Sequence, residues 1–149
     1  MNYALVIGLI SVVIAQTTKI ITAGIAEKKF LPWMILSNGG MPSSHTAFVI
    51  SVTISIAITV GMSSPVFAVA AMMALIVIND AVGVRYEAGK HAFVLNQLIE
   101  DLKALSLSDM PNEKKLKELL GHKPIEVFGG IVAGTVVAIA GYFLIFPYF

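Results

Sequence analysis

The sequence has no cysteine and few charged residues. Without cysteine there is neither a disulfide framework nor a thiolate metal site, and the redox compartment stays undetermined. Charged residues make up only 13% of the 149 positions, whereas 57% are hydrophobic and the mean hydropathy is +0.87. So few charges cannot give a soluble domain a normally hydrated surface. The composition therefore excludes an ordinary soluble globular protein and predicts an integral membrane protein.

Several motifs are also missing. The chain has no Walker-type or dinucleotide-binding glycine loop, and no His-Glu-x-x-His spacing that would predict a metal site. Its 10 basic residues are balanced by 9 acidic ones, so binding to nucleic acid is not expected. We predict neither a metal nor another cofactor.

The apolar residues form long runs that are typical of membrane helices. We expect an all-α helical bundle, a single membrane domain with about four transmembrane helices at roughly 3–26, 46–62, 65–80 and 125–146. The segment 81–124 carries most of the charges, and apolar residues at helical spacing from Phe93 to Leu105 predict an amphipathic helix there. Asp109 is expected to cap a second, short helix that ends at Leu120.

The basic residues predict how these helices are oriented. All 10 Lys and Arg residues lie on one side of a four-span arrangement or close to it, and the 62–65 turn and both termini have none. The positive-inside rule places 27–40 and 81–123 in the cytoplasm and both termini outside the cell. The same cytoplasmic side holds the 3 histidines. In this multi-pass protein of the cell membrane, every candidate for chemistry then faces one aqueous boundary.

The run from Asn38 to Ala47, with sequence NGGMPSSHTA, lies between a charged segment and an apolar run. It is typical of a turn that opens onto a helix. Gly40 lets the backbone approach a ligand closely, and Ser43 or Ser44 can cap the helix. Free N–H groups, hydroxyls and the imidazole of His45 would then converge at a helix N-terminus, which favours anions. The alternative is an ordinary capped helix with an incidental histidine.

Three charged residues lie in or beside the predicted spans. Lys19 falls within the first hydrophobic stretch, where an ionisable group is costly and is usually functional. The alternative is that Lys19 extends to the cytoplasmic interface. Asp80 ends the third span, and Arg85, which can grip phosphate or carboxylate oxygens with its planar fork, follows five residues later. Asp80 and Arg85 either pair at the interface, or Asp80 orients Arg85 or a histidine.

The imidazoles of His45, His91 and His122 can act near neutral pH as nucleophile, base or acid. For His91 the alternative is a surface position on the amphipathic segment. For His122 it is a favourable position for a cation just past a helix end. Gly130 and Gly134 in the last span have the small-xxx-small spacing that allows close contact between helices.

The run Pro42-Ser43-Ser44-His45 resembles the Pro-Ser-Gly-His block of membrane type 2 phosphatidic acid phosphatases and vanadium haloperoxidases. Arg85, five residues and then His91 resemble the third block of that superfamily, in which the arginine holds phosphate and the histidine is the nucleophile. The closer similarity is to the divergent PAP2 branch, related to acid phosphatases and vanadium-dependent haloperoxidases. It runs nearly end to end, through the segments 39–45, 80–85, 88–89, 95–96 and 120–127.

The chain also departs from the parent superfamily. The first block there is a lysine, six residues and then Arg-Pro, whereas Ala26-Glu27 stands at the corresponding distance from Lys19. The third block has an aspartate four residues after the nucleophile, and Leu95 stands at that position here. In the divergent branch His122 is more characteristic than His91, so both remain candidates for the nucleophile.

The resemblance implies a metal-independent membrane phosphatase that hydrolyses a lipid phosphate or diphosphate, prenyl or glycerolipid, at the cytoplasmic membrane face. His91 or His122 would form a phosphohistidine, His45 would protonate the leaving group, and Asp80 would orient an imidazole. The residues expected to hold the phosphoryl oxygens are Lys19, Gly40, Ser43, Ser44 and Arg85. One alternative is a non-catalytic carrier, transporter or scaffold for phosphorylated lipid, which with four short helices would need a homo-oligomer. Another is a purely structural membrane protein.

Overall fold

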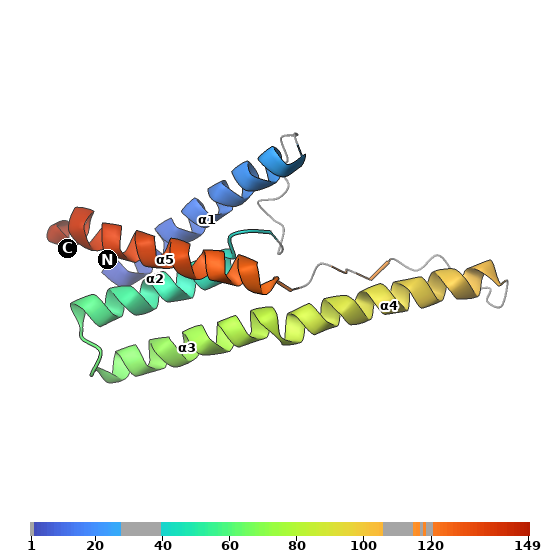
Figure 1. The fold of residues 1–149 in the computed structure, drawn as a ribbon. Helices are drawn as coiled ribbons and strands as arrows, with labels where there is room; N and C mark the ends of the chain where they lie inside the picture. Colours follow the sequence, from blue (N-terminus) through green and yellow to red (C-terminus); the bar gives the residue numbers. More distant parts are fainter. Residues whose placement is uncertain (1, 28–39, 106–114, 117, 119–120) are drawn as a thin grey trace.

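The computed structural model describes residues 2–27, 40–105, 115–116, 118 and 121–149. These parts of the chain are all-α, as predicted (Figure 1). The helices, in chain order, are α1 (Tyr3–Glu27), α2 (Ser44–Thr59), α3 (Pro65–Val82), α4 (Val84–Ala104), α5 (Pro124–Leu144) and the short 3₁₀ helix η2 (Phe146–Tyr148).

Local signals explain where the helices begin. The hydroxyl of Ser64 accepts a hydrogen bond from the Phe67 N–H, and Pro65 stands in the first turn of α3. Asn2 caps α1 in the same way, because its Oδ1 accepts from the Leu5 N–H at 3.1 Å. At the start of α5 the Glu126 carboxylate accepts from the Lys123 N–H at 3.2 Å.

The helices form a bundle in which α2 packs against α1, α3 and α5, and α1 packs against α5. Both termini lie at one end of this bundle (Figure 1). From that end α1 and α3 run away, and α2 and α5 run back (Figure 1). The helix α4 continues α3 with little change in direction and extends beyond the bundle (Figure 1).

Three helices are long and apolar enough to cross a membrane: α1, α5 and the continuous α3–α4 rod. The fourth expected span, α2, is apolar but has only 16 residues and ends at Thr59 rather than at Met62. It ends early because the N–H groups of Val60 and Gly61 both bond to the Ile56 carbonyl, with Gly61 at φ +100°. At 1.5 Å per residue α2 is about 24 Å long, less than the roughly 30 Å of a hydrocarbon core.

The predicted close contact at Gly130 and Gly134 is confirmed. A Cβ at Gly130 would lie 2.6 Å from the Ser43 carbonyl oxygen, and one at Gly134 would lie 2.5 Å from that of Ala47. Only glycine lets the backbone of α5 lie this close to α2. This contact holds the start of α2 against the first turns of α5.

The short helix expected from Asp109 to Leu120 is not present at the described positions, since Lys115 and Leu116 are not helical. Instead the side chain of Asn96 bonds to both backbone groups of Leu116. Its Nδ2 donates to the Leu116 carbonyl at 2.9 Å, and its Oδ1 accepts from the Leu116 N–H at 2.9 Å. These bonds use the polar groups that a helix would need at Leu116. We call residues 115, 116, 118 and 121–123 the return segment, because they lead back along α4 to α5. The positions from 109 to 114, and Asn38 and Gly39, lie outside the described residues.

Candidate active site

Apart from His91, the predicted site residues come from four parts of the chain at the end of the bundle opposite the termini. These are the second half of α1, the loop 40–43 with the first turn of α2, the α3–α4 junction and the return segment. The loop is tied to α1 by the Thr22 hydroxyl, which donates to the Met41 carbonyl at 2.9 Å, and to α5 by the Ser43 N–H, which donates to the Glu126 carbonyl at 2.9 Å. Gly40 has φ +98°, a backbone conformation that residues with a side chain rarely adopt. The loop is therefore held on both sides.

The predicted cap at the start of α2 is confirmed for Ser43. Its Oγ accepts from the Thr46 N–H at 3.4 Å and from the Thr46 hydroxyl at 3.0 Å. Because this hydroxyl caps the helix, Ser43 holds the helix end in place. The N–H groups of Ser44 and His45 stand in the first turn, where no intrahelical acceptor exists. Ser44 is buried, and His45 is exposed.

At the α3–α4 junction Asp80 and Arg85 form the predicted ion pair, with 2.6 Å between Arg85 Nε and Asp80 Oδ2. Both side chains are partly exposed, with 50% of the arginine and 35% of the aspartate accessible. A pair this exposed contributes little to stability. The ion pair does fix the orientation of the Arg85 guanidinium. A guanidinium that binds phosphate oxygens needs such a fixed orientation.

The return segment places His122 beside this junction. The backbone N–H of His122 donates to the Ala81 carbonyl at 3.1 Å. One residue earlier, Gly121 lies directly against the backbone of Arg85 and Tyr86, where there is no room for a side chain. The His122 side chain is only 4% exposed, and among the described residues its Nε2 has no hydrogen-bond partner. An unpartnered buried nitrogen of this kind calls for an explanation.

The surroundings of His122 lower its pKa to about 4, first by burial and then by the nearby charges of Lys19, His45 and Arg85. All three cationic groups are thus close enough to act on the same imidazole. At neutral pH His122 is neutral, and its ring can accept a proton or attack an electrophile. We call Lys19, His45, Arg85 and His122 the His122 cluster.

Lys19 belongs to the inner face of α1. Tyr3, Ile7, Ser11, Ala15 and Lys19 are spaced four residues apart and all are buried. The Lys19 side chain is 1% exposed and interacts electrostatically with Glu126 in the first turn of α5. A lysine that extends to the membrane surface would be exposed. The burial of Lys19 therefore favours the interpretation in which its ammonium group acts inside the protein.

His91 lies apart from the His122 cluster. It is exposed on α4, six residues beyond Arg85, and is not among the charges that act on His122. Sequence reasoning missed Asn96, which is 6% exposed and anchors the return segment through Leu116 and through the Glu118 carboxylate at 2.8 Å. The available signal was an amide on the face of the amphipathic helix that otherwise buries Gly89 and Ala92.

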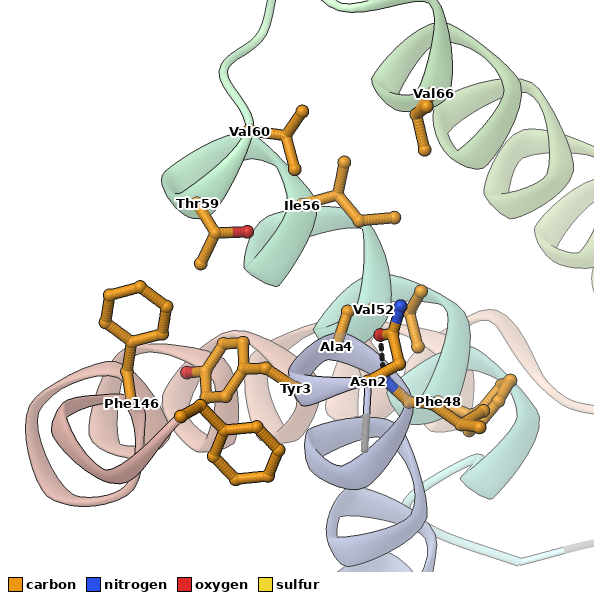
Figure 2. A pocket seen from close by; sticks show the side chains of 12 residues that line it. Asn2, Tyr3, Ala4, Phe48, Val52, Ile56, Thr59, Val60, Val66 and Phe146 are labelled. Atoms are coloured by element: carbon orange, nitrogen blue, oxygen red, sulfur yellow. Dashed lines mark hydrogen bonds between the residues drawn. The ribbon is translucent and has the colours of Figure 1, made fainter.

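A cavity of about 810 Å³ lies at the other end of the bundle, near both termini. Figure 2 shows Tyr3, Phe48, Val52, Ile56 and Phe146 around it. Its walls are mainly apolar, and none of the predicted site residues contributes to them. The predicted site residues near His122 and this cavity therefore lie at opposite ends of the bundle. Within the described residues, no group of three or more His, Asp or Glu side chains is placed to hold a metal ion.

Comparisons with known proteins agree with the resemblance drawn from the motifs. Residues 1–137 match the model of the divergent PAP2 family. The chain is 40% identical over 152 aligned residues to the Bacillus subtilis (strain 168) protein named "Uncharacterized membrane protein YuiD", covering 95% of this chain and 96% of the relative. No solved structure is significantly similar to the chain. The matched region includes all four segments that build the His122 cluster, and the chain belongs to the divergent PAP2 family.

Proposed function

We propose that this protein is a membrane phosphatase that hydrolyses a lipid phosphate or diphosphate, with His122 as the nucleophile. The observation that carries the proposal is a buried, neutral imidazole whose Nε2 has no hydrogen-bond partner among the described residues and whose nearby charges are Lys19, His45 and Arg85. Cations around a neutral nucleophile suit a phosphoryl group, because they hold its oxygens while the imidazole attacks phosphorus.

The placement of His122 favours it over His91. A nucleophile must be close to the groups that hold the phosphoryl oxygens, and Lys19 and Arg85 both act on the His122 imidazole. The low pKa of His122 also keeps its ring unprotonated at neutral pH, so its lone pair is available. His91 is exposed on α4 and is not among the charges that act on His122.

The reaction needs two steps. His122 Nε2 attacks phosphorus and the P–O bond to the lipid breaks, while His45 donates a proton to the leaving oxygen. Water then attacks the phosphohistidine and gives its proton to His45, which releases inorganic phosphate and restores both histidines. General acid–base catalysis by His45 would contribute about 10²–10⁴ in rate.

The phosphoryl oxygens would be held by Lys19, Arg85 and the first-turn N–H groups of α2. Asp80 would orient Arg85 through their 2.6 Å ion pair. Each such contact to the developing charge is typically worth about 10²–10³ in rate. A substrate with an acyl or prenyl tail fits a site built at one end of a membrane bundle. The positive-inside rule places that end in the cytoplasm.

The test measures phosphate release by purified protein from prenyl and glycerolipid phosphates and diphosphates, with and without EDTA. We expect turnover that survives EDTA, is lost in His122→Asn and is retained in His91→Asn. Loss of turnover in His91→Asn alone would move the nucleophile to His91, and loss with EDTA would assign the histidines to a metal site. If no substrate releases phosphate while a known homologous phosphatase is active in parallel, the protein is not this enzyme.

One observation favours a carrier as the second candidate. Buried hydroxyl groups continue from the site into the bundle between α1 and α2, where the Ser51 hydroxyl donates to Ser11 Oγ at 2.9 Å and Ser55 lies one turn further on. Such polar groups inside a membrane bundle are also typical of a path for a polar headgroup. His45→Ala discriminates the two functions, since an enzyme would lose turnover whereas a carrier would keep both lipid-phosphate binding and transfer between vesicle leaflets.

A further inference from the structure

The helix α4 has an exposed apolar face outside the bundle. Leu95, Leu98 and Leu105 are 47%, 52% and 66% exposed. Leu95 and Leu98 project from this 21-residue helix, which is about 31 Å long at 1.5 Å per residue, and Leu105 is the residue that caps its C-terminal end. A face with this much exposed leucine on an otherwise polar helix marks an interaction surface.

The spacing of this face is that of a coiled coil. Its positions alternate in steps of four and three residues through Val84, Ala88, His91, Leu95, Leu98, Leu102 and Leu105. This is a heptad pattern of about three repeats, with Ala88, Leu95 and Leu102 at a positions and the other four residues at d positions. We call these seven residues the α4 seam.

We propose that the α4 seam pairs with the α4 seam of a second copy of this chain in a parallel, two-stranded coiled coil. Two copies inserted in the same membrane have the same orientation, so their α3 helices point the same way. Because α4 continues α3 away from the bundle, the two α4 helices project in parallel (Figure 1). The same direction of α4 argues against a helix that lies flat on the lipid surface.

The residues beside the seam suit this partner. In a parallel pair, g positions meet e positions of the partner five residues further on, which would bring Val94 of one copy against Ile99 of the other. The polar residues Lys90, Gln97, Glu100 and Lys103 occupy outer positions together with the apolar Phe93, and the charged residues Glu87 and Asp101 stand at g positions beside the seam.

The return segment leaves the seam accessible. It covers a different side of α4, where Gly89, Ala92 and Asn96 are buried. Confinement in the membrane raises the effective concentration of the two helices, so a seam of only three repeats can pair. His91, which lies outside the His122 cluster, would face its counterpart at a d position. A polar pair inside an apolar seam favours a single register there, as polar residues are known to do at a positions.

Site-directed cross-linking tests the pair directly, because the chain has no cysteine and single-cysteine variants need no altered background. Full-length Leu98→Cys, Leu105→Cys and Gln97→Cys are oxidised in native membranes and separated without reductant. Facing core positions fall within disulfide reach. We expect disulfide-linked dimers at positions 98 and 105, with Gln97→Cys, on the outer side of the same helix, at least tenfold less cross-linked.

The outcomes separate the alternatives. Cross-linking at position 98 without position 105 would indicate antiparallel helices and overturn the parallel arrangement. Cross-linking at all three positions equally, or at none, would overturn the pairing of the seam. Equal membrane amounts and thermal transitions of the three variants show that each is folded. The measurement needs no substrate, so its result is independent of the proposed phosphatase.

Discussion

Gly121→Ala tests whether the return segment positions His122. The added Cβ would run into the backbone N and Cα of Tyr86 and the carbonyl carbon of Arg85. Backbone cannot rotate away as a side chain can, so the return segment must move by roughly an ångström to reach an ordinary van der Waals distance. The hydrogen bond from His122 N–H to Ala81, worth about 1 kcal/mol, would be strained or lost. A displacement of about 1 Å at a reacting group costs about 10²-fold in rate.

We therefore expect kcat/KM for the lipid phosphate to fall about 100-fold in Gly121→Ala. The thermal transition of the bundle should change little, because the contacts among α1, α2 and α5 do not involve this residue. Gly129→Ala is the matched control, since a Cβ there would meet the flexible end of the Met41 side chain at 2.9 Å, which can move aside. Full activity in Gly121→Ala would refute this account of how His122 is held.

Individual contacts lead to four further predictions. The NMR titration of the His122 ring should have its midpoint at about pH 4, because burial and neighbouring positive charges disfavour the imidazolium. The signal is assigned as the one that is lost in His122→Gln. A midpoint near pH 6.5 would show that the ring is not buried. Since an unfolded histidine takes up its proton near pH 6.5, the free energy of unfolding should fall as the pH is lowered from about 6.5 to 4. Asn96→Ala removes both bonds to the Leu116 backbone and should make the 115–118 region sensitive to limited proteolysis while the helices stay intact, whereas Gln97→Ala should not. Gly134→Leu would force α5 off the Ala47 backbone and should lower the thermal transition in detergent by several degrees, with Val136→Leu, on an exposed position of α5, as the control.

Much of the fold is predictable from the sequence, because hydrophobic length and periodicity reflect what a membrane requires. The all-α architecture, the start of α2 at Ser43 and the close glycine contacts of α5 all follow from local patterns. The pairing of Asp80 with Arg85 was predictable in the same way, since both lie at one helix junction. Each of these features has a sequence signal made by residues within a few turns of one another, although the contact that Gly130 and Gly134 allow is with the distant segment Ser43–Ala47.

The features that sequence reasoning missed depend on contacts between distant segments. Asn96 binds the backbone of Leu116, and Gly121 fits against the backbone of Tyr86, so neither contact leaves a periodic signal. The helix expected to end at Leu120 is not formed at Lys115 and Leu116 for the same reason. The amide of Asn96, 20 residues away, bonds to the backbone groups of Leu116. The end of α2 at Thr59 depended on the conformation of Gly61, which an apolar run does not reveal.

The placement of His122 bears on one departure from the parent superfamily, the missing aspartate of the third block. The blocks of that superfamily put the nucleophile six residues after the arginine and an aspartate four residues later, all on one segment. Here the histidine beside Arg85 comes instead from the return segment, and the carboxylate beside Arg85 is Asp80, from the end of α3. If His122 is the nucleophile, an aspartate at position 95 would have no imidazole to orient. An apolar residue such as Leu95 can then occupy that position and contribute to the α4 seam. Under the two proposals, two histidines that the motif alone leaves equivalent would have separate roles: His122 in phosphoryl transfer and His91 in pairing of the chain.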